Sequence, residues 1–183
     1  QFSADIALPQ PGSPNTKKQV CYGCRGYGCG RVTYEVADGT KGKFYCGSAV
    51  FYKRWLNMYY GTRDWELQFR ATRLLDNAGL DSLSFGIVML PWLWNCYQAG
   101  ILTEENTGIP LSKMGSLEFL ETVVKKICLR EGFGDILAQG VGRAAELVGK
   151  GSGELVTEPS TEATTPLSLR TGETLANDPR LHL

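Results

Sequence analysis

The sequence predicts a mainly α-helical chain, in which an irregular segment rich in cysteine and glycine, with short strands, precedes a bundle of about four helices. Two observations support this prediction. Apolar residues recur at helical spacing from Asp64 onward. Before that point, residues 21–62 hold four of the six cysteines, together with short aromatic runs bounded by glycine. With 183 residues and 43% hydrophobic side chains, the chain is large enough to bury a core.

Composition divides the chain into three regions. Residues 1–20 hold three prolines and little apolar periodicity, which predicts an extended lead-in. Residues 21–149 are expected to form one helical domain. Residues 150–183 are rich in Thr, Glu, Pro and Gly and have few large apolar side chains, which predicts a polar linker or the start of a further domain.

Two runs within residues 21–62, RVTYEV and KFYCGSAVFY, have the composition of strands. The first helix is expected to begin at Asp64 and to end at Gly79, because glycine after the last apolar position is a common helix terminator. Its apolar face consists of Leu67, Ala71, Leu74, Leu75 and Ala78.

The second helix is expected to begin with Ser82 or Ser84 as its N-cap and to run to Gly100. Pro91 lies inside this helix and is expected to bend or split it. The helix covers the most apolar stretch of the chain, residues 85–102, but polar residues interrupt that stretch and no basic residues flank it. A buried helix therefore fits better than a membrane span, which needs about 20 nearly uninterrupted apolar residues.

The third helix is expected to be capped by Ser116 and to close before Gly132. Cys128 lies on its apolar stripe, and Cys96 lies on the apolar stripe of the second helix. Both cysteines are therefore predicted to be buried core residues.

A fourth helix is expected to begin at Asp135 or its neighbour. Its apolar face would consist of Ile136, Leu137, Gly140, Val141, Ala144, Ala145 and Val148. Gly140 and Ala144 are small enough to let another backbone come close.

The charge balance argues against two classes of partner. The 19 Lys and Arg residues equal the 19 Asp and Glu residues in number. Proteins that bind nucleic acid or anionic membrane surfaces generally need a cationic excess. Neither class of partner is therefore expected, and the lack of a secretion signal pattern predicts a cytoplasmic location.

Cys21, Cys24 and Cys29 form a C-x2-C-x4-C run set among glycines. Thiolates at this spacing can reach three corners of one metal centre, and this favours an iron–sulfur cluster. A structural zinc site with Cys46 as fourth ligand is a second interpretation. A disulfide set or free thiols is the third, and it is disfavoured because nothing in the sequence indicates an oxidising compartment.

Three motifs occur in order along the chain: CYGCRGYGCGR at 21–31, DNAGLD at 76–81 and REGFGDILAQG at 130–140. Together they resemble the aldehyde ferredoxin oxidoreductase family of tungsten-pterin enzymes over residues 20–149. The resemblance implies the central helical domain of a larger enzyme, so that the chain is a fragment. The third motif is interpreted as architectural, a helix end followed by the next helix start.

The resemblance also implies two cofactors. It makes Cys21, Cys24 and Cys29 ligands of a 4Fe-4S cluster, whose fourth cysteine comes from a later domain. It assigns contacts to a tungsten (or molybdenum) bis-pterin to Asp76, Gly79, Leu80 and Asp81. A carboxylate can accept paired hydrogen bonds from the amino-pyrimidinone edge, and a glycine lets the chain pass close to a flat ring. From the pattern alone, both aspartates would instead be expected to flank a helix end and its turn.

The chain departs from the family pattern at two places. Many members have three residues between the second and third cysteines and a proline after the second, where this chain has Arg25 and Gly26. Where aldehyde-oxidising members have a short acidic stretch, this chain has KFYCGSAVFY. The second departure resembles the tungsten subunit of class II benzoyl-CoA reductases, in which a cysteine sulfur coordinates tungsten. It implies that Cys46 is a metal ligand and a catalytic residue.

The resulting prediction is an oxidoreductase that reduces an aromatic acyl-CoA thioester at low potential, with electrons from an iron–sulfur subunit or ferredoxin. Oxidation of aldehydes to carboxylic acids is the alternative enzyme activity. An alternative of another class is a non-catalytic module with one metal site made of four cysteines. Cys46 would also be compatible with a small buried residue of a strand.

Overall fold

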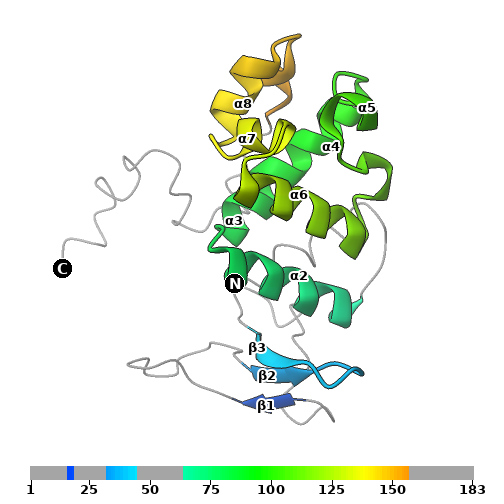
Figure 1. Ribbon diagram of the computed structural model, residues 1–183, viewed down its shortest axis with the longest axis vertical. Helices are drawn as coiled ribbons and strands as arrows, with labels where there is room; N and C mark the ends of the chain where they lie inside the picture. Colours follow the sequence, from blue (N-terminus) through cyan, green and yellow to red (C-terminus); the bar gives the residue numbers. More distant parts are fainter. Residues whose placement is uncertain (1–15, 19–31, 45–63, 157–183) are drawn as a thin grey trace, which may run out of the picture.

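The structure is a computed structural model of the 183-residue chain and describes residues 16–18, 32–44 and 64–156. A small sheet lies at one end of the molecule, and the helices are grouped beside it (Figure 1). The strands are β1 (Thr16–Lys18), β2 (Val32–Glu35) and β3 (Lys41–Phe44). The α-helices are α2 (Trp65–Ala78), α3 (Ser82–Ser84), α4 (Leu90–Gln98), α5 (Glu104–Thr107), α6 (Leu117–Leu129), α7 (Phe133–Leu137) and α8 (Val141–Val148). The prediction of a mainly helical chain with a few short strands is confirmed.

The strands form one antiparallel sheet in the order β1-β2-β3. Strand β2 lies within the predicted run RVTYEV. Strand β3 includes the first two residues of KFYCGSAVFY, and the rest of that run lies outside the described residues. The register pairs Lys18 with Val32 and Val32 with Phe44, so these three residues share the last row at one end of the sheet.

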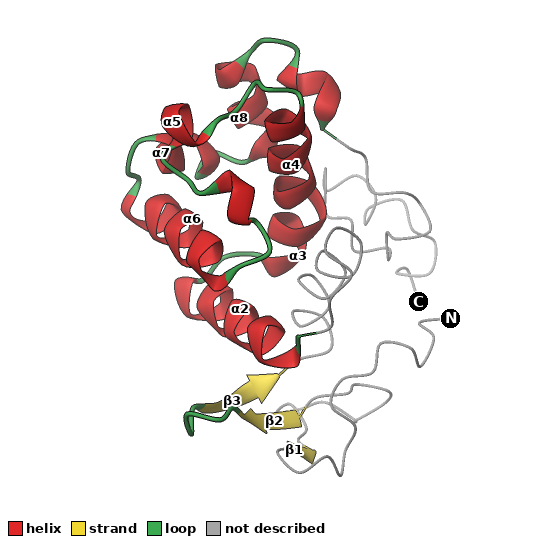
Figure 2. Cartoon of the chain, turned by 90° about the vertical axis from the view of Figure 1, so that its right-hand side faces the viewer, coloured by secondary structure: helices red, strands yellow, loops and turns green. Residues whose placement is uncertain are grey.

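The sheet is attached to the helical group through α2 (Figure 2). The rings of Tyr34 and Phe69 meet edge to face, with their centroids 5.2 Å apart. The Arg73 guanidinium lies over the Phe69 ring, 5.7 Å from its centroid, and its Nη1 donates to the Lys41 carbonyl at 2.6 Å. One face of α2 therefore binds the sheet.

Helix α2 begins and ends as its sequence predicts. The Asp64 carboxylate accepts the Leu67 N–H at 3.0 Å and caps the first turn. Gly79 follows the last turn with φ of 67°. Both predicted boundaries are confirmed.

The second helix differs from the prediction at its start and in its middle. Its N-cap is Asp81, and neither Ser82 nor Ser84 has that role. Pro91 does not split the helix, because α3 and α4 are joined by a π-helical segment, η2 (Phe85–Met89), in which the Leu90 N–H donates to the Phe85 carbonyl. This wider turn immediately precedes Pro91, which lies in the first turn of α4. Within residues 64–156 and the described strands, no helix is both long and apolar enough to cross a membrane.

The third helix, α6, is capped by Ser116, whose Oγ accepts the Phe119 N–H at 3.2 Å, and it closes before Gly132. Cys96 is fully buried, as predicted. The prediction for Cys128 is wrong, because this cysteine is exposed. It lies about 100° around the helix from Ile127 and therefore at the margin of the apolar stripe.

The predicted fourth helix is two helices, α7 and α8. The break falls at Gly140, which has φ of 87° and, in the part of the chain that the structure describes, no atom beyond its chain neighbours within 4 Å of the position that a Cβ would occupy. Gly140 therefore provides a turn and not the predicted close approach. The close approach occurs at Gly134, where an added Cβ would overlap the Lys126 backbone.

Strand β1 lies in the predicted lead-in, and three short elements of the helical region were not predicted: α5, the 3-10 turn η3 (Leu111–Lys113) and the 3-10 turn η4 (Ser152–Leu155). The last of these is anchored to α4. Trp92 Nε1 donates to the Ser152 carbonyl at 2.9 Å, and Asn95 Nδ2 donates to the Leu155 carbonyl at 3.2 Å. The packed chain thus continues past the composition change at residue 150.

The hydrophobic core lies among α2, α4, α6, α7 and α8. Its largest fully buried side chains are Leu75, Leu90, Trp92, Leu93, Ile109, Leu111 and Phe119. Burial of these apolar side chains supplies the main favourable term for the packing of the helices.

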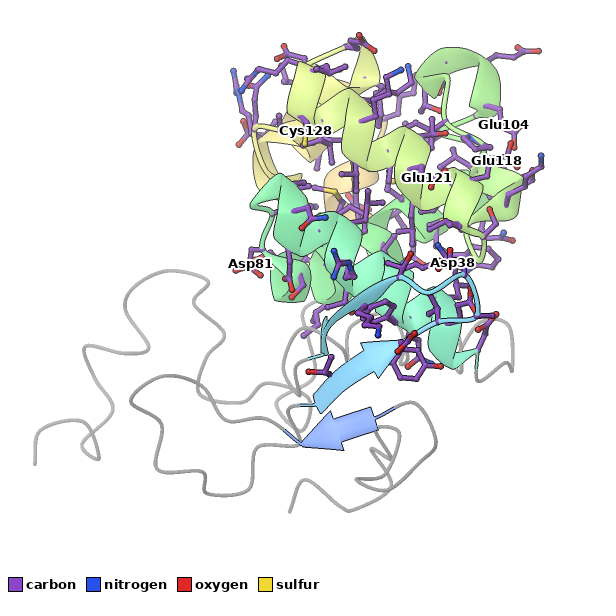
Figure 3. The ribbon with its side chains drawn as sticks, turned by 60° about the horizontal axis from the view of Figure 1, so that its bottom comes forward. Asp38, Asp81, Glu104, Glu118, Glu121 and Cys128 are labelled. Carbon is purple, nitrogen blue, oxygen red and sulfur yellow. The ribbon has the colours of Figure 1, made fainter. Side chains whose placement is uncertain are left out.

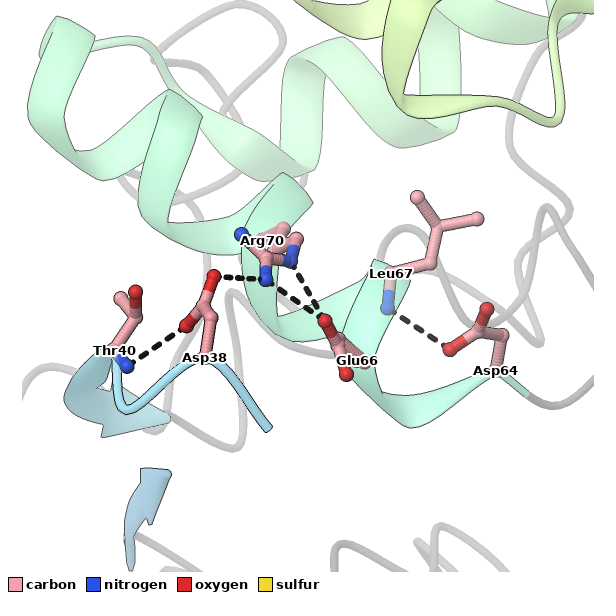
Figure 4. A network of polar contacts seen from close by, with 6 residues as sticks. All are labelled: Asp38, Thr40, Asp64, Glu66, Leu67 and Arg70. Carbon is pink, nitrogen blue, oxygen red and sulfur yellow. Dashed lines mark hydrogen bonds and ion pairs between the residues drawn. The ribbon is translucent and has the colours of Figure 1, made fainter. Parts of the chain in front are cut away.

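The turn between β2 and β3 is joined to α2 by an ionic network (Figure 4). Arg70 Nη2 lies 2.5 Å from Asp38 Oδ2 and 2.8 Å from Glu66 Oε1. Asp38 Oδ1 also accepts the Thr40 N–H at 2.8 Å. The hydrogen bonds from Arg70 and Thr40 hold the pKa of Asp38 well below its usual range.

This depressed pKa predicts an acid-sensitive contact between the sheet and α2. Because Asp38 titrates lower in the folded chain than in the unfolded chain, its contribution is present at neutral pH and is lost as the pH falls below about 4. We expect Asp38→Asn to flatten the fall of the unfolding temperature between about pH 4 and pH 2. Thermal unfolding of wild type and variant across this range measures the effect, and two parallel curves would contradict it.

Candidate cofactor site

The sequence-predicted site residues fall into two groups. Asp76, Gly79, Leu80 and Asp81 lie in the described part of the chain, where α2 ends and α3 begins. Cys21, Cys24, Cys29 and Cys46 lie outside the described residues. Among the residues that are described, no group of three or more His, Cys, Asp or Glu side chains is arranged to hold a metal ion.

The DNAGLD motif forms a tight helix ending. The Gly79 N–H donates to the Asp76 carbonyl at 3.2 Å, and the Leu80 N–H donates to the Leu75 carbonyl at 3.0 Å. This pair of bonds is the Schellman arrangement, which needs a left-handed residue at the position of Gly79. Among the described residues, apart from the chain neighbours of Gly79, no atom lies within 4 Å of the position that a Cβ on Gly79 would take, so this part of the structure leaves open space on that side of the turn.

The two aspartates of the motif differ in their local roles. Asp81 Oδ1 accepts the Ser84 N–H at 2.8 Å, so its carboxylate is used as the cap of α3. Figure 3 shows Asp81 at the edge of the helical group. The Asp76 carboxylate accepts no hydrogen bond from any residue that the structure describes, and the turn uses only its backbone carbonyl. Its side chain is therefore available to a ligand.

The environment of Asp76 favours its neutral form slightly. Partial burial raises the pKa of its carboxyl, and the positive charge of Arg73 acts in the opposite direction. A ligand that donates hydrogen bonds to the carboxylate would satisfy it and lower that pKa.

Asp76 ends a polar stripe along α2 that also contains Gln68 and Thr72. The three residues are spaced four apart, so they lie on one face, between the side that binds the sheet and the side that faces the core. Gln68 and Thr72 are both fully buried. Thr72 Oγ1 donates to the Gln68 carbonyl at 2.9 Å. The sequence analysis did not single out Gln68, although its spacing of two helical turns from Asp76 was a usable signal.

Buried side-chain polar atoms without a hydrogen bond are few in the described part of the chain. They are Gln68 Oε1, Gln68 Nε2 and Thr33 Oγ1. Both polar atoms of the Gln68 carboxamide are thus buried and unpaired among the described residues. Such groups are rare in folded proteins and call for an explanation.

Comparison with known proteins identifies the family of this chain. Residues 12–164 match the family model described as aldehyde ferredoxin oxidoreductase, domains 2 and 3. The matched segment is most of the chain. The chain belongs to the aldehyde ferredoxin oxidoreductase family. This confirms the family resemblance that the three motifs indicated.

Similar proteins within the family include tungsten-containing aldehyde ferredoxin oxidoreductases of three archaea. The chain is 34% identical to that of Pyrococcus furiosus over 73% of its own length and 21% of the relative's. For Pyrococcus horikoshii the values are 33%, 71% and 21%, and for Thermococcus kodakarensis they are 32%, 78% and 24%. The chain therefore spans about a fifth of the length of these relatives. The names of these relatives do not test whether the chain belongs to the benzoyl-CoA reductase branch of the family, and that assignment stays a prediction.

The family match covers the whole described fold. Residues 12–164 include all three strands, the described helices, the cysteine run at 21–29 and Cys46. The helix ending at Gly79 and the polar stripe on α2 are therefore parts of an aldehyde ferredoxin oxidoreductase domain.

Proposed function

We propose that this chain is part of the catalytic subunit of a tungsten-bis-pterin, 4Fe-4S oxidoreductase. The observation that supports this most directly is the Asp76 carboxylate, which no described residue pairs, beside the turn at Gly79, in a chain of this family. In this proposal residues 21–149 form the cofactor-binding domain and residues 1–20 are an extended lead-in to it. Residues 150–183 are a polar linker or the start of a further domain.

The residues present at the turn fit a pterin. The Asp76 carboxylate would accept hydrogen bonds from the amino-pyrimidinone edge. Gly79 lacks a side chain on the open side, so a flat ring can approach the backbone there. Leu80 and Asp81 would border the same site, with the Asp81 carboxylate keeping the turn in place as the cap of α3. The bound cofactor supplies the two-electron chemistry, and the protein binds it, orients it and excludes water.

The sheet supports a common location for the predicted metal ligands. Lys18, Val32 and Phe44 share one end row, and the chain leaves or enters the sheet there. Cys21 and Cys29 are each three positions from this row, and Cys46 is two positions from it. A residue extends the chain by at most about 3.6 Å, so each of these thiols is tethered within roughly 11 Å of the row, apart from side-chain length.

For the reaction, we propose two-electron reduction of an aromatic acyl-CoA thioester. Electrons from an iron–sulfur subunit or ferredoxin would pass through the cluster held by Cys21, Cys24 and Cys29. Two electrons and two protons would convert one ring double bond to a single bond. The proposal rests on Cys46, because a thiolate is a soft donor suited to a low-potential tungsten site. The proposed thiolate ligands and low-potential cluster would need a reducing compartment, which supports the prediction of a cytoplasmic location.

Oxidation of aldehydes to carboxylic acids is the second candidate. It is favoured by the names of the relatives, each of which is a tungsten-containing aldehyde ferredoxin oxidoreductase. Water would supply the added oxygen, and two electrons would leave through the cluster to ferredoxin.

Metal analysis together with two assays tests the proposed function. We expect the purified protein that contains this chain to hold roughly four irons and one tungsten or molybdenum per subunit. We expect it to reduce an aromatic CoA thioester with a low-potential donor. Aldehyde oxidation with a viologen acceptor, without thioester reduction, would favour the second candidate. One zinc per chain without iron or tungsten would instead support a structural module in which four cysteines bind the metal.

A further inference from the structure

We propose that Arg73 is a positioning residue, which fixes strand β3 against helix α2 and thereby sets where the proposed tungsten ligand Cys46 lies relative to the pterin turn. This inference rests on the proposed function and extends it to a residue outside the three motifs. Arg73 lies in the third turn of α2 and is half-buried.

Three contacts restrain the Arg73 side chain. Its Nη1 donates to the Lys41 carbonyl at 2.6 Å, and its guanidinium lies over the Phe69 ring, 5.7 Å from the centroid. The side chain also passes so close to Gly42 that a Cβ there would overlap Nη1. Gly42 has no left-handed φ that would itself require glycine, and glycine weakens a strand interior. The space that Arg73 needs therefore accounts for the glycine in β3.

Ion pairing does not account for the arginine at this position. Arg70, about one turn earlier on α2, pairs with Asp38 and Glu66 and so holds the turn between β2 and β3 (Figure 4). Arg73 forms no ion pair with any residue that the structure describes. Its guanidinium is directed to a backbone carbonyl of β3, so its contact holds the strand itself.

The topology connects this contact to Cys46. Residues 45–63, which include Cys46, join the end of β3 to the start of α2. A contact that holds β3 on α2 therefore fixes both ends of this segment relative to each other. Strand β3 is an outer strand of the described sheet, so β2 holds only one of its edges there.

The same helix carries the pterin turn. Asp76 lies three positions after Arg73, which separates the two residues by about 4.5 Å along the axis of α2. The positive charge of Arg73 also acts to lower the pKa of the Asp76 carboxyl. One side chain thus links the strand that leads to Cys46 with the end of α2 proposed to bind the pterin.

Four variants of the full protein that contains this chain separate positioning from stability. Arg73→Met removes both the donor and the charge, whereas Arg73→Lys keeps a charged donor. Gly42→Ala keeps the arginine but displaces its guanidinium. Arg70→Met is the matched control, because it also removes a contact between α2 and the sheet.

Two quantities are measured on these variants. One is the EPR spectrum of protein poised with its tungsten or molybdenum in the +5 state, because the g values depend on the atoms bound to the metal. The other is hydrogen exchange of the β3 amides in protein produced in cells that make no pterin cofactor, which reports the hold on the strand without the metal.

We expect Arg73→Met and Gly42→Ala to shift the g values and to speed exchange of the β3 amides about three- to tenfold, because the hydrogen bond to the Lys41 carbonyl is lost. Arg73→Lys should stay closer to wild type in both quantities. Arg70→Met should leave the g values unchanged.

Unchanged g values in Arg73→Met, despite faster exchange, would make Arg73 a purely structural residue and overturn the inference. An equal shift in Arg70→Met would overturn it too, because any loosening of the sheet would then suffice. If Arg73→Met does not fold, Gly42→Ala decides between the same outcomes. Wild-type protein with neither tungsten nor molybdenum would instead overturn the proposed function, and unchanged g values in Cys46→Ala would overturn the proposed role of Cys46.

Discussion

Replacing Gly134 with alanine is expected to destabilise the helical domain by about 3 kcal/mol. Gly134 lies in α7, which packs against the last turn of α6. A Cβ at this position would overlap the carbonyl carbon and oxygen of Lys126. That carbonyl already accepts the Glu131 N–H at 3.0 Å in the bond that ends α6. The added methyl must therefore displace backbone, which no change of side-chain rotamer can avoid.

Hydrogen exchange of the α6 amides measures this effect without requiring two-state unfolding of the whole protein. A loss of about 3 kcal/mol corresponds to exchange that is faster by about 100-fold. Gly142→Ala is the matched control, because Gly142 is also helical but, outside its own helix backbone, no described atom lies within 4 Å of its Cβ position. We expect that variant to be more stable by about 0.5 kcal/mol. Equal effects of the two substitutions would show that close packing is not what requires glycine at Gly134.

The helix boundaries that sequence predicts well here are those set by local chemistry. Asp64 and Ser116 each cap a helix through a side chain that bonds a backbone N–H three residues ahead. Gly79 ends α2 in the left-handed conformation that glycine adopts at little cost. These interactions lie within a few residues of chain, so the sequence around them contains the necessary information.

Features that depend on distant packing are predicted less well. Periodicity places Cys128 in the core, but α6 buries a narrower stripe than that prediction assumes. The sequence predicts a close contact at Gly140, whereas it occurs at Gly134 because α7 folds back onto Lys126. Before Pro91, the widened turn of η2 joins α3 to α4, so that of the two predicted outcomes, a bend or a split, the split does not occur. In each case the outcome depends on how neighbouring elements pack against the helix, and the periodicity of apolar residues contains no information on that packing.

The candidate site shows the same division. The turn at Gly79 and the two aspartates follow from a short motif and could be read from sequence. The four-residue spacing of Gln68, Thr72 and Asp76 could be read from sequence, but it did not indicate burial, because a glutamine in a helix is usually solvated. The significance of Gln68 comes from complete burial without a hydrogen-bond partner among the described residues. Only the folded arrangement shows that the polar stripe on α2 is buried at one end.

Cys46→Ala is expected to have the largest effect on function. If the Cys46 sulfur binds tungsten, its removal takes away one soft donor that the cofactor's own sulfurs do not replace. We expect turnover to fall at least about 100-fold and tungsten content to drop, while iron content stays near the wild-type value. Elemental analysis by mass spectrometry and the thioester reduction assay on the same preparation measure both quantities.

Two other cysteines make the interpretation of Cys46→Ala specific. Cys24→Ala should produce the opposite pattern, in which iron is lost first, because Cys24 is a proposed ligand of the cluster. Cys128→Ala should change neither metal, since Cys128 is exposed on α6 and belongs to no proposed site. If Cys46→Ala keeps both its tungsten and its turnover, Cys46 is a structural residue, and the argument for thioester reduction is lost. Aldehyde oxidation would then be the better proposal, because it rests on the relatives and not on this thiol.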